Sequence, residues 1–83
     1  MKIKDRLGNQ LHEGDFVVLC NQAEAVKRDF EVWQVVGENT SLPKQHMAYI
    51  VGLYSGRTDC FCADMLKKID ITKIAKGVVI DVH

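Results

Sequence analysis

The sequence predicts a mainly β protein, a small SH3-like barrel of five to six short strands with one or two single helical turns. Its apolar segments are rich in β-branched and aromatic residues and are too short to form stable isolated helices. Turn-forming residues interrupt the chain at intervals of about 8–12 residues, a spacing typical of small sandwiches and barrels. The length of 83 residues suits one core, so we expect residues 1–83 to form a single small β-barrel domain.

The opening of the chain alternates turns with one firm strand. Gly8-Asn9 is a turn-forming pair that predicts a small hairpin, and residues 12–15 predict a second turn. Residues 16–20 read Phe-Val-Val-Leu-Cys, which predicts a strand because the run is apolar, β-forming and short. Residues 23–28 have a helix-forming composition, but the segment is short, so we expect a loop or one helical turn.

Residues 30–36 predict a second long strand that stops at Gly37. Strand alternation divides its side chains between two faces. One interpretation points Phe30, Val32 and Val36 inward and leaves Trp33 and Val35 outside. The reversed register makes Trp33 the core anchor, and the sequence alone leaves both interpretations open.

The second half of the chain predicts a hairpin and a terminal strand. Residues 39–47 hold the single proline and predict an exposed loop. Residues 48–54 predict a third strand, which a turn joins to a short strand over residues 60–62. Residues 63–66 predict one tight helical turn, after which Leu66 and Ile69 enter the core. One more turn is expected within residues 70–76, followed by a strand over residues 78–82.

A resemblance rests on the pattern Asp5-x-x-Gly8-x-x-Leu11-x-x-Gly14-Asp15-x-Val17, followed by Leu66-x-x-Ile69. It resembles the opening and closing of SH3-like small barrels, including the KOW type and the phosphonoacetate-hydrolase-operon type. The resemblance implies that Gly14-Asp15 forms the turn before the first long strand and that Val17 points inward. In its size and neutral charge the chain also looks like small accessory proteins of bacteria and their phages. Small barrels carry many unrelated functions, so the resemblance implies a fold more than an activity.

The charge pattern gives little support to nucleic acid or membranes as partners. Eleven basic and eleven acidic residues cancel, and no long run of like charge occurs. A nucleic-acid-binding, KOW-like barrel stays open as an alternative, with Trp33 or Tyr54 stacking on bases and scattered cations nearby. Those cations are Lys27, Arg28, Lys44, Arg57, Lys67 and Lys68. No apolar run is long enough to cross a bilayer, and no secretory signal is recognisable, so we expect a cytoplasmic protein.

The cysteines allow a third alternative, a small metal-binding domain that uses Cys60 and Cys62. Three cysteines are an odd number, which favours reduced thiols over disulfides. The Cys-x-Cys spacing differs from the usual zinc knuckle and is awkward for chelation on a strand. Ordinary packing of two small side chains beside Phe61 is the favoured interpretation. We therefore expect no metal and no cofactor.

Catalysis has no sequence support. The chain contains no phosphate-binding loop, zincin motif or nucleophile elbow. Asp59 and Asp64 flank the cysteines, but both lie in expected turns, where aspartate usually caps backbone N–H groups. We therefore expect a non-enzymatic protein.

Surplus apolar surface favours a protein-interaction module, an adaptor or accessory domain that binds a protein partner or self-associates into a homo-oligomer. Both faces of the strands expected at 30–36 and 48–54 are apolar, whereas a barrel has only one inside. Exposed Trp is enriched at the centres of protein interfaces. The predicted partner-binding residues are Trp33, Val35, Tyr49, Val51 and Leu53, together with the loop at 39–47.

Overall fold

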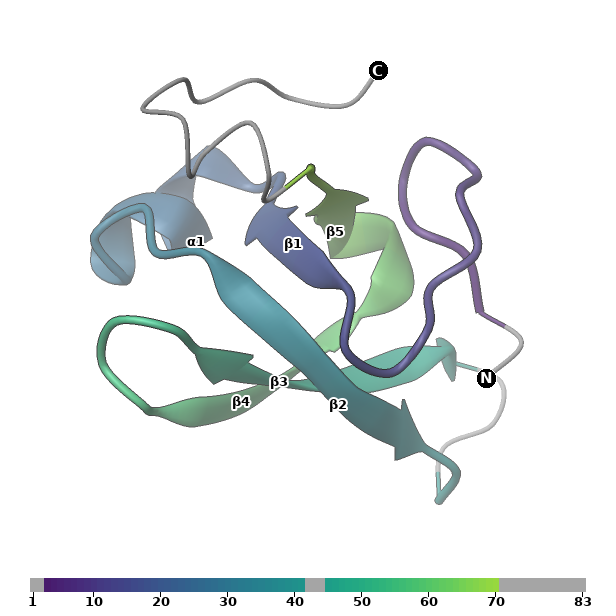
Figure 1. Ribbon diagram of the computed structural model, residues 1–83. Coiled ribbons are helices and arrows are strands. Elements are labelled where there is room, and N and C mark those ends of the chain that lie inside the picture. Colours follow the sequence, from purple (N-terminus) through teal and green to yellow (C-terminus); the bar gives the residue numbers. More distant parts are fainter. Residues whose placement is uncertain (1–2, 42–44, 71–83) are drawn as a thin grey trace.

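The computed structural model describes residues 3–41 and 45–70 (Figure 1). Its elements are strand β1 (Phe16–Leu19), helix α1 (Gln22–Lys27), strands β2 (Trp33–Asn39), β3 (Met47–Gly52) and β4 (Thr58–Cys62), the 3-10 turn η2 (Ala63–Met65) and strand β5 (Leu66–Lys68). Most of the regular structure is therefore β, which confirms the predicted fold class. The expected strand at 78–82 and the expected turn at 70–76 lie at least in part outside the described residues.

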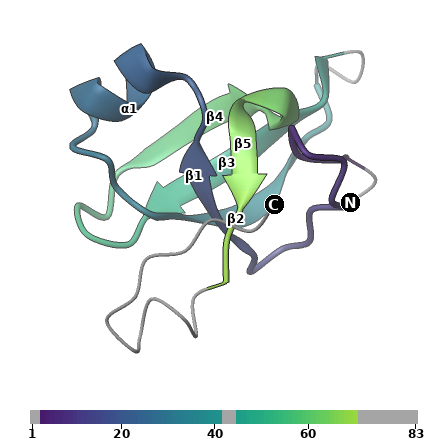
Figure 2. The same cartoon turned by 90° about the horizontal axis from the view of Figure 1, so that it is seen from above.

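The strands form one antiparallel sheet in the order β4-β3-β2-β1-β5. Strands β4 and β5 are the two edges of this sheet and do not pair with each other in the described part of the chain. The sheet is therefore open, and the closed barrel suggested by the sequence is not formed. Turn η2 leads the chain from β4 directly to β5, which pairs with β1 at the opposite edge (Figure 2).

Asp5 and Gly14, two residues of the opening motif, stabilise turns. The Asp5 carboxylate accepts hydrogen bonds from the backbone N–H groups of Leu7 (3.0 Å), Asn9 (2.7 Å) and Lys68 (2.9 Å). Asp5 is buried, so one side chain both closes the first hairpin and ties it to β5. Gly14 adopts a φ of 95°, a conformation that glycine adopts without strain. The expected turn before β1 and the inward orientation of Val17 are confirmed.

Helix α1 is the single helical turn that residues 23–28 suggested, with a defined cap. The Asn21 side chain accepts a hydrogen bond from the backbone N–H of Glu24 (3.1 Å), which caps the first turn. The helix packs against β1 at one end of the sheet (Figure 2).

Strand β2 begins three residues later than the sequence predicts. Asp29 and Phe30 have φ values of 56° and 54°, in the left-handed region, so the chain cannot be extended there. The strand then continues past Gly37 to Asn39, because a register shift between Val35 and Gly37 absorbs one extra residue. The prediction that Gly37 ends the strand is therefore wrong.

The core lies on the inner face of the sheet, and α1 and η2 each contribute a buried residue to it. Its largest fully buried side chain is Trp33, and Leu66 and Ile69 are buried, as predicted. The cluster comprises Ile3, Leu11, Val17, Leu19, Ala25, Trp33, Val35, Ala48, Ile50, Phe61, Ala63 and Leu66.

Candidate interaction surface

The outward-facing side chains of β2, β3 and β4 form a continuous surface that we call the outer sheet face. In β3 every second residue is buried, and in β2 and β4 the buried residues are Trp33, Val35 and Phe61. Strand pairing aligns Gln34 with Val51, and Val51 with Thr58, on the side that faces away from the core. The outer sheet face consists of Gln34, Val36, Asn39, Met47, Tyr49, Val51, Thr58, Cys60 and Cys62, with Leu53 directly after β3.

The β3 part of the predicted interaction stripe lies on this face. Tyr49 is 44% exposed, Leu53 is 48% exposed, and Val51 between them is half-buried. These three residues alternate with Ile50 and Gly52, which are buried on the inner side. The structure therefore brings Tyr49, Val51 and Leu53 together on one surface.

Trp33 and Val35 do not belong to that surface. The prediction that these two side chains point outward and bind a partner directly is wrong in its placement. Each is 1% exposed and lies in the core. Strand pairing sets Trp33 opposite Val17 on one side and Gly52 on the other, so the indole occupies the centre of the inner face. The reversed register is thus the observed one. The left-handed Asp29 and Phe30 lie before β2, so Phe30 is not part of the strand.

Val36 lies on the outer sheet face, which excludes the interpretation that pointed Phe30, Val32 and Val36 inward. The register shift between Val35 and Gly37 leaves Val36 without a cross-strand partner, and Val36 is 43% exposed. Phe30, also expected inside, is 65% exposed in the segment before β2. Sequence alternation alone cannot locate such a bulge, because it adds one residue to an otherwise regular period.

The outer sheet face is uncharged. Its polar members are the neutral side chains of Gln34, Asn39 and Thr58, and its other members are apolar or sulfur-containing. Elsewhere on the described chain, charges form local pairs: Lys27 and Arg28 with Glu24, and Lys68 with Asp15. Depletion of charge is characteristic of the central part of protein interfaces.

A buried carboxylate fixes the turn that follows β3. Glu31 accepts hydrogen bonds from the backbone N–H of Tyr54 (2.8 Å), the Ser55 hydroxyl (2.9 Å) and the backbone N–H of Ser55. Burial raises the pKa of Glu31, but these bonds and the charge of Arg57 lower it by more, so its pKa lies below the ordinary value. A Cβ atom at Gly52 would lie 2.5 Å from this carboxylate, so any other residue there would have to displace Glu31 from these bonds.

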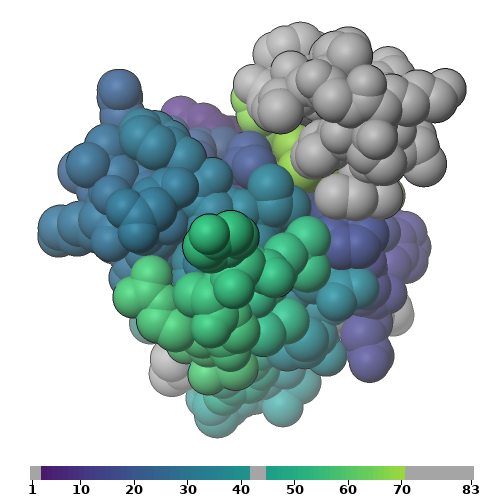
Figure 3. All heavy atoms as spheres, turned by 60° about the vertical axis from the view of Figure 1, so that its left-hand side comes forward, coloured from purple at the N-terminus to yellow at the C-terminus, as the bar shows by residue number. Residues whose placement is uncertain are grey.

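This turn presents an aromatic side chain that the sequence analysis assigned only to nucleic acid. Tyr54 is 97% exposed while its backbone is held by Glu31. Figure 3 shows the β3–β4 turn (green) projecting beside helix α1 (blue). Neither Glu31 nor the rigidity of the turn could be found by sequence motif, because a single glutamate before a strand has no distinctive pattern.

Arg28 fastens helix α1 to strand β4. Its guanidinium bonds the Asp59 carboxylate (Nε to Oδ2, 3.0 Å) and the Glu24 carboxylate (Nη1 to Oε2, 2.6 Å). It also lies over the Phe61 ring, 4.7 Å from the ring centre. Asp59 in turn accepts the backbone N–H of Cys60 (2.9 Å), a group on the edge strand. These contacts occupy part of the β4 edge, which limits pairing with another strand there.

The predicted interaction loop at 39–47 is described only at its two ends. The Asn39 side chain accepts a hydrogen bond from the Ser41 backbone N–H (3.0 Å) and donates one to Cys60 Sγ (3.7 Å). His46 adopts a left-handed φ of 49° before β3 begins. Residues 42–44, which include Lys44, lie outside the described part.

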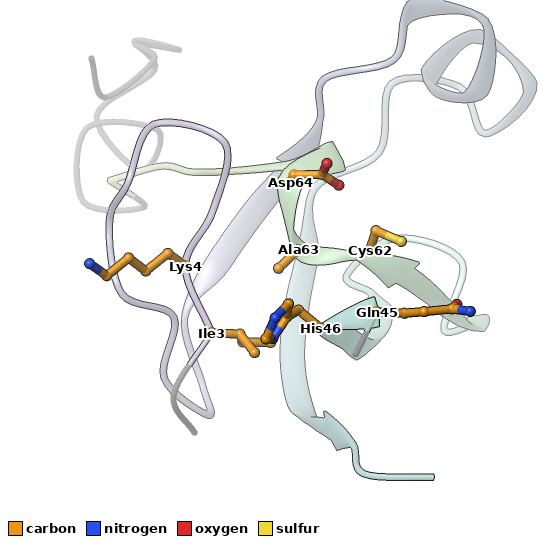
Figure 4. A pocket seen from close by; sticks show the side chains of 7 residues that line it. All are labelled: Ile3, Lys4, Gln45, His46, Cys62, Ala63 and Asp64. Carbon is orange, nitrogen blue, oxygen red and sulfur yellow. The ribbon is translucent and has the colours of Figure 1, made fainter. Parts of the chain in front are cut away.

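The structure does not assemble a Cys-His site. A hollow beside η2 is lined by Ile3, Lys4, Gln45, His46, Cys62, Ala63 and Asp64. In Figure 4 the Cys62 sulfur points away from the His46 ring, and the Asp64 carboxylate points in another direction. Within residues 3–41 and 45–70, no three His, Cys, Asp or Glu side chains are grouped to hold a metal ion. No cysteine forms a disulfide.

Comparison with protein families, with curated proteins and with solved structures finds no match to this chain. In the described part of the chain, no helix is both long and apolar enough to span a lipid bilayer.

Proposed function

We propose that this chain is a non-catalytic protein-interaction module that binds a protein partner, or a second copy of itself, through the outer sheet face. The observation that carries the proposal is an uncharged sheet face on which Val36 and Tyr49 are each more than two-fifths exposed. Burying such side chains gains about 25 cal/mol for each Å² of apolar surface removed from water.

The frame around this face is rigid, which favours binding. Glu31 fixes the β3–β4 turn, and Arg28 joins α1 to β4. A surface that is already ordered loses less conformational entropy when it binds, so more of the contact energy becomes affinity. Five short antiparallel strands and a 3-10 turn are also compatible with the SH3-like class that the opening motif resembles. We retain the cytoplasm as the proposed compartment.

Nucleic acid is a weaker candidate on this structure. Trp33 is buried and cannot stack on a base. Arg28 is committed to Glu24 and Asp59, and Lys68 pairs with Asp15. Tyr54 and Arg57 remain as surface groups for such a role, but they lie beside a face without cations.

The proposal is tested with a matched pair of charge insertions. Tyr49→Lys places a charge on the outer sheet face, whereas Val26→Lys places one on helix α1, where Val26 is 53% exposed. Sedimentation velocity across a range of concentrations first shows whether the purified chain self-associates. If it is monomeric, the same variants are titrated against a protein that co-purifies with the wild-type chain.

We expect Tyr49→Lys to weaken association by at least about tenfold and Val26→Lys to leave it unchanged, with both variants folding normally. Equal binding by wild type and Tyr49→Lys overturns the assignment of the face. A salt-dependent complex with single-stranded DNA or RNA, in a chain that binds no protein, overturns the proposed class.

A further inference from the structure

Three sulfur-containing side chains share one end of the outer sheet face. Cys60 and Cys62 are alternate residues of β4 with the buried Phe61 between them, so both point outward, and both are half-buried. Met47 is the first residue of β3, also half-buried, and lies directly opposite Cys62 in the strand pairing. The Cys and His pattern of the sequence does not reveal this group, because its third member is a methionine from another strand.

The hydrogen-bond pattern shows that Met47 and Cys62 form a close pair. The Ala63 N–H donates to the His46 carbonyl (2.9 Å), and the Gly52 N–H donates to the Arg57 carbonyl (2.8 Å). Bonded and non-bonded pairs alternate along an antiparallel ladder, so Met47 and Cys62 are a non-hydrogen-bonded pair. In such pairs the Cα atoms are about 4.5 Å apart and the side chains are close. Cys60 is then the diagonal neighbour of Met47, within reach of its long, flexible side chain.

A polar group already contacts one of these sulfurs. The Asn39 amide nitrogen donates to Cys60 Sγ at 3.7 Å, and Asn39 is paired with Met47 across β2 and β3. The Cys60 sulfur therefore accepts a polar contact from strand β2, and cysteine binds metal ions as the thiolate. None of the cysteines is tied up in a disulfide, so both thiols are available for this chemistry.

We propose that Cys60, Cys62 and Met47 form a binding site for a soft monovalent metal ion, Cu(I). Thiolate and thioether ligands select Cu(I) over harder cations. Zn²⁺ fits less well, because a structural zinc site requires four nitrogen or sulfur ligands, and the described residues provide no third Cys, His, Asp or Glu ligand here. Binding replaces two S–H bonds with two S–Cu bonds and releases two protons to solvent. The Met47 thioether adds a third, neutral donor without proton loss.

This inference does not depend on the proposed protein-interaction role. The sulfur group lies where β3 begins and β4 ends, whereas Val51 and Leu53 lie at the other end of the face. Metal binding and protein association are measured separately, so failure of one leaves the other standing.

The test is an anaerobic Cu(I) titration of the reduced full chain against a chromophoric Cu(I) chelator. Ag(I), which does not change oxidation state, serves as a second probe and separates binding from copper redox chemistry. Cys60→Ser and Cys62→Ser remove the thiolates, Met47→Leu removes the thioether at nearly constant volume, and Cys20→Ser is the matched thiol control. Circular dichroism verifies that each variant is folded.

We expect one equivalent of Cu(I) per chain. Affinity falls at least about 100-fold in Cys60→Ser and Cys62→Ser, falls about tenfold in Met47→Leu, and is unchanged in Cys20→Ser. The proposal is overturned if wild type fails to compete with the chelator. It is also overturned if Cys20→Ser weakens binding as much as Cys62→Ser, or if the Cys60→Ser/Cys62→Ser double variant still binds with wild-type affinity.

Discussion

Replacing Trp33 with alanine is expected to come close to unfolding the protein. The indole is 1% exposed and is the largest fully buried side chain of the core. Truncation of a buried Trp to alanine typically costs about 3–5 kcal/mol, through lost burial and the cavity that remains. A chain of 83 residues has a total stability of about 4–12 kcal/mol at typical values per residue. One substitution therefore removes about a quarter of the stability or more.

The matched variant is Trp33→Phe. The indole Nε1 is buried without a hydrogen-bond partner among the described residues, and burial of an unpaired donor costs about 1–3 kcal/mol. Phenylalanine keeps an aromatic ring and removes that donor, so we expect it to cost clearly less than alanine. Urea unfolding followed by far-ultraviolet circular dichroism measures both, since this signal does not require the tryptophan. If Trp33→Ala lowers the unfolding free energy by less than about 1 kcal/mol, Trp33 is not the core anchor.

Three further predictions concern the frame around the outer sheet face. Gly52→Ala should destabilise the fold by about 1–3 kcal/mol in urea unfolding, because the new methyl group meets the Glu31 carboxylate, whereas Gly37→Ala, at a glycine with open space around it and no positive φ, should cost less. The folded pKa of Glu31 lies below its ordinary value of 4.5, so its stabilising contribution is present above that pH and is lost as pH falls through the folded pKa. The unfolding free energy, measured from pH 6 down to below the folded pKa of Glu31, should therefore fall more steeply in wild type than in Glu31→Gln, and equal slopes would exclude this role. Arg28→Ala should cost about 1–2 kcal/mol and increase aggregation at the β4 edge, measured by light scattering, while Lys27→Ala should do neither.

The fold class could be predicted because short apolar segments and turn residues are local signals. Phe16 to Leu19 has too few residues for a helix and too many β-formers for a loop, and it is a strand. Gly14 and Asp15 form a turn for reasons carried by their own backbone and side chain. The strand pairing is not local: β5 and its position beside β1 depend on Asp5, which lies 63 residues before Lys68 in the chain. No local pattern contains that contact.

The candidate site could be predicted only in part, because the two strands behave differently. In β3 the alternation is regular, and Tyr49, Val51 and Leu53 share a face as expected. In β2, Trp33 and Val35 occupy the inner face, whereas one interpretation of the alternation pointed Phe30 inward. Alternation alone fits either face, and neither the left-handed Phe30 nor the bulge at Val36 is marked in the hydrophobic period.

The most direct measurement is hydroxyl-radical footprinting of the chain free and in its assembly, with oxidation read at Tyr49 and Phe30. Both rings are accessible in the isolated chain, Tyr49 on the outer sheet face and Phe30 in the segment before β2. Binding through the outer sheet face should protect Tyr49 strongly and leave the oxidation of Phe30 almost unchanged. Protection of Phe30 with Tyr49 still fully reactive would contradict the proposed surface.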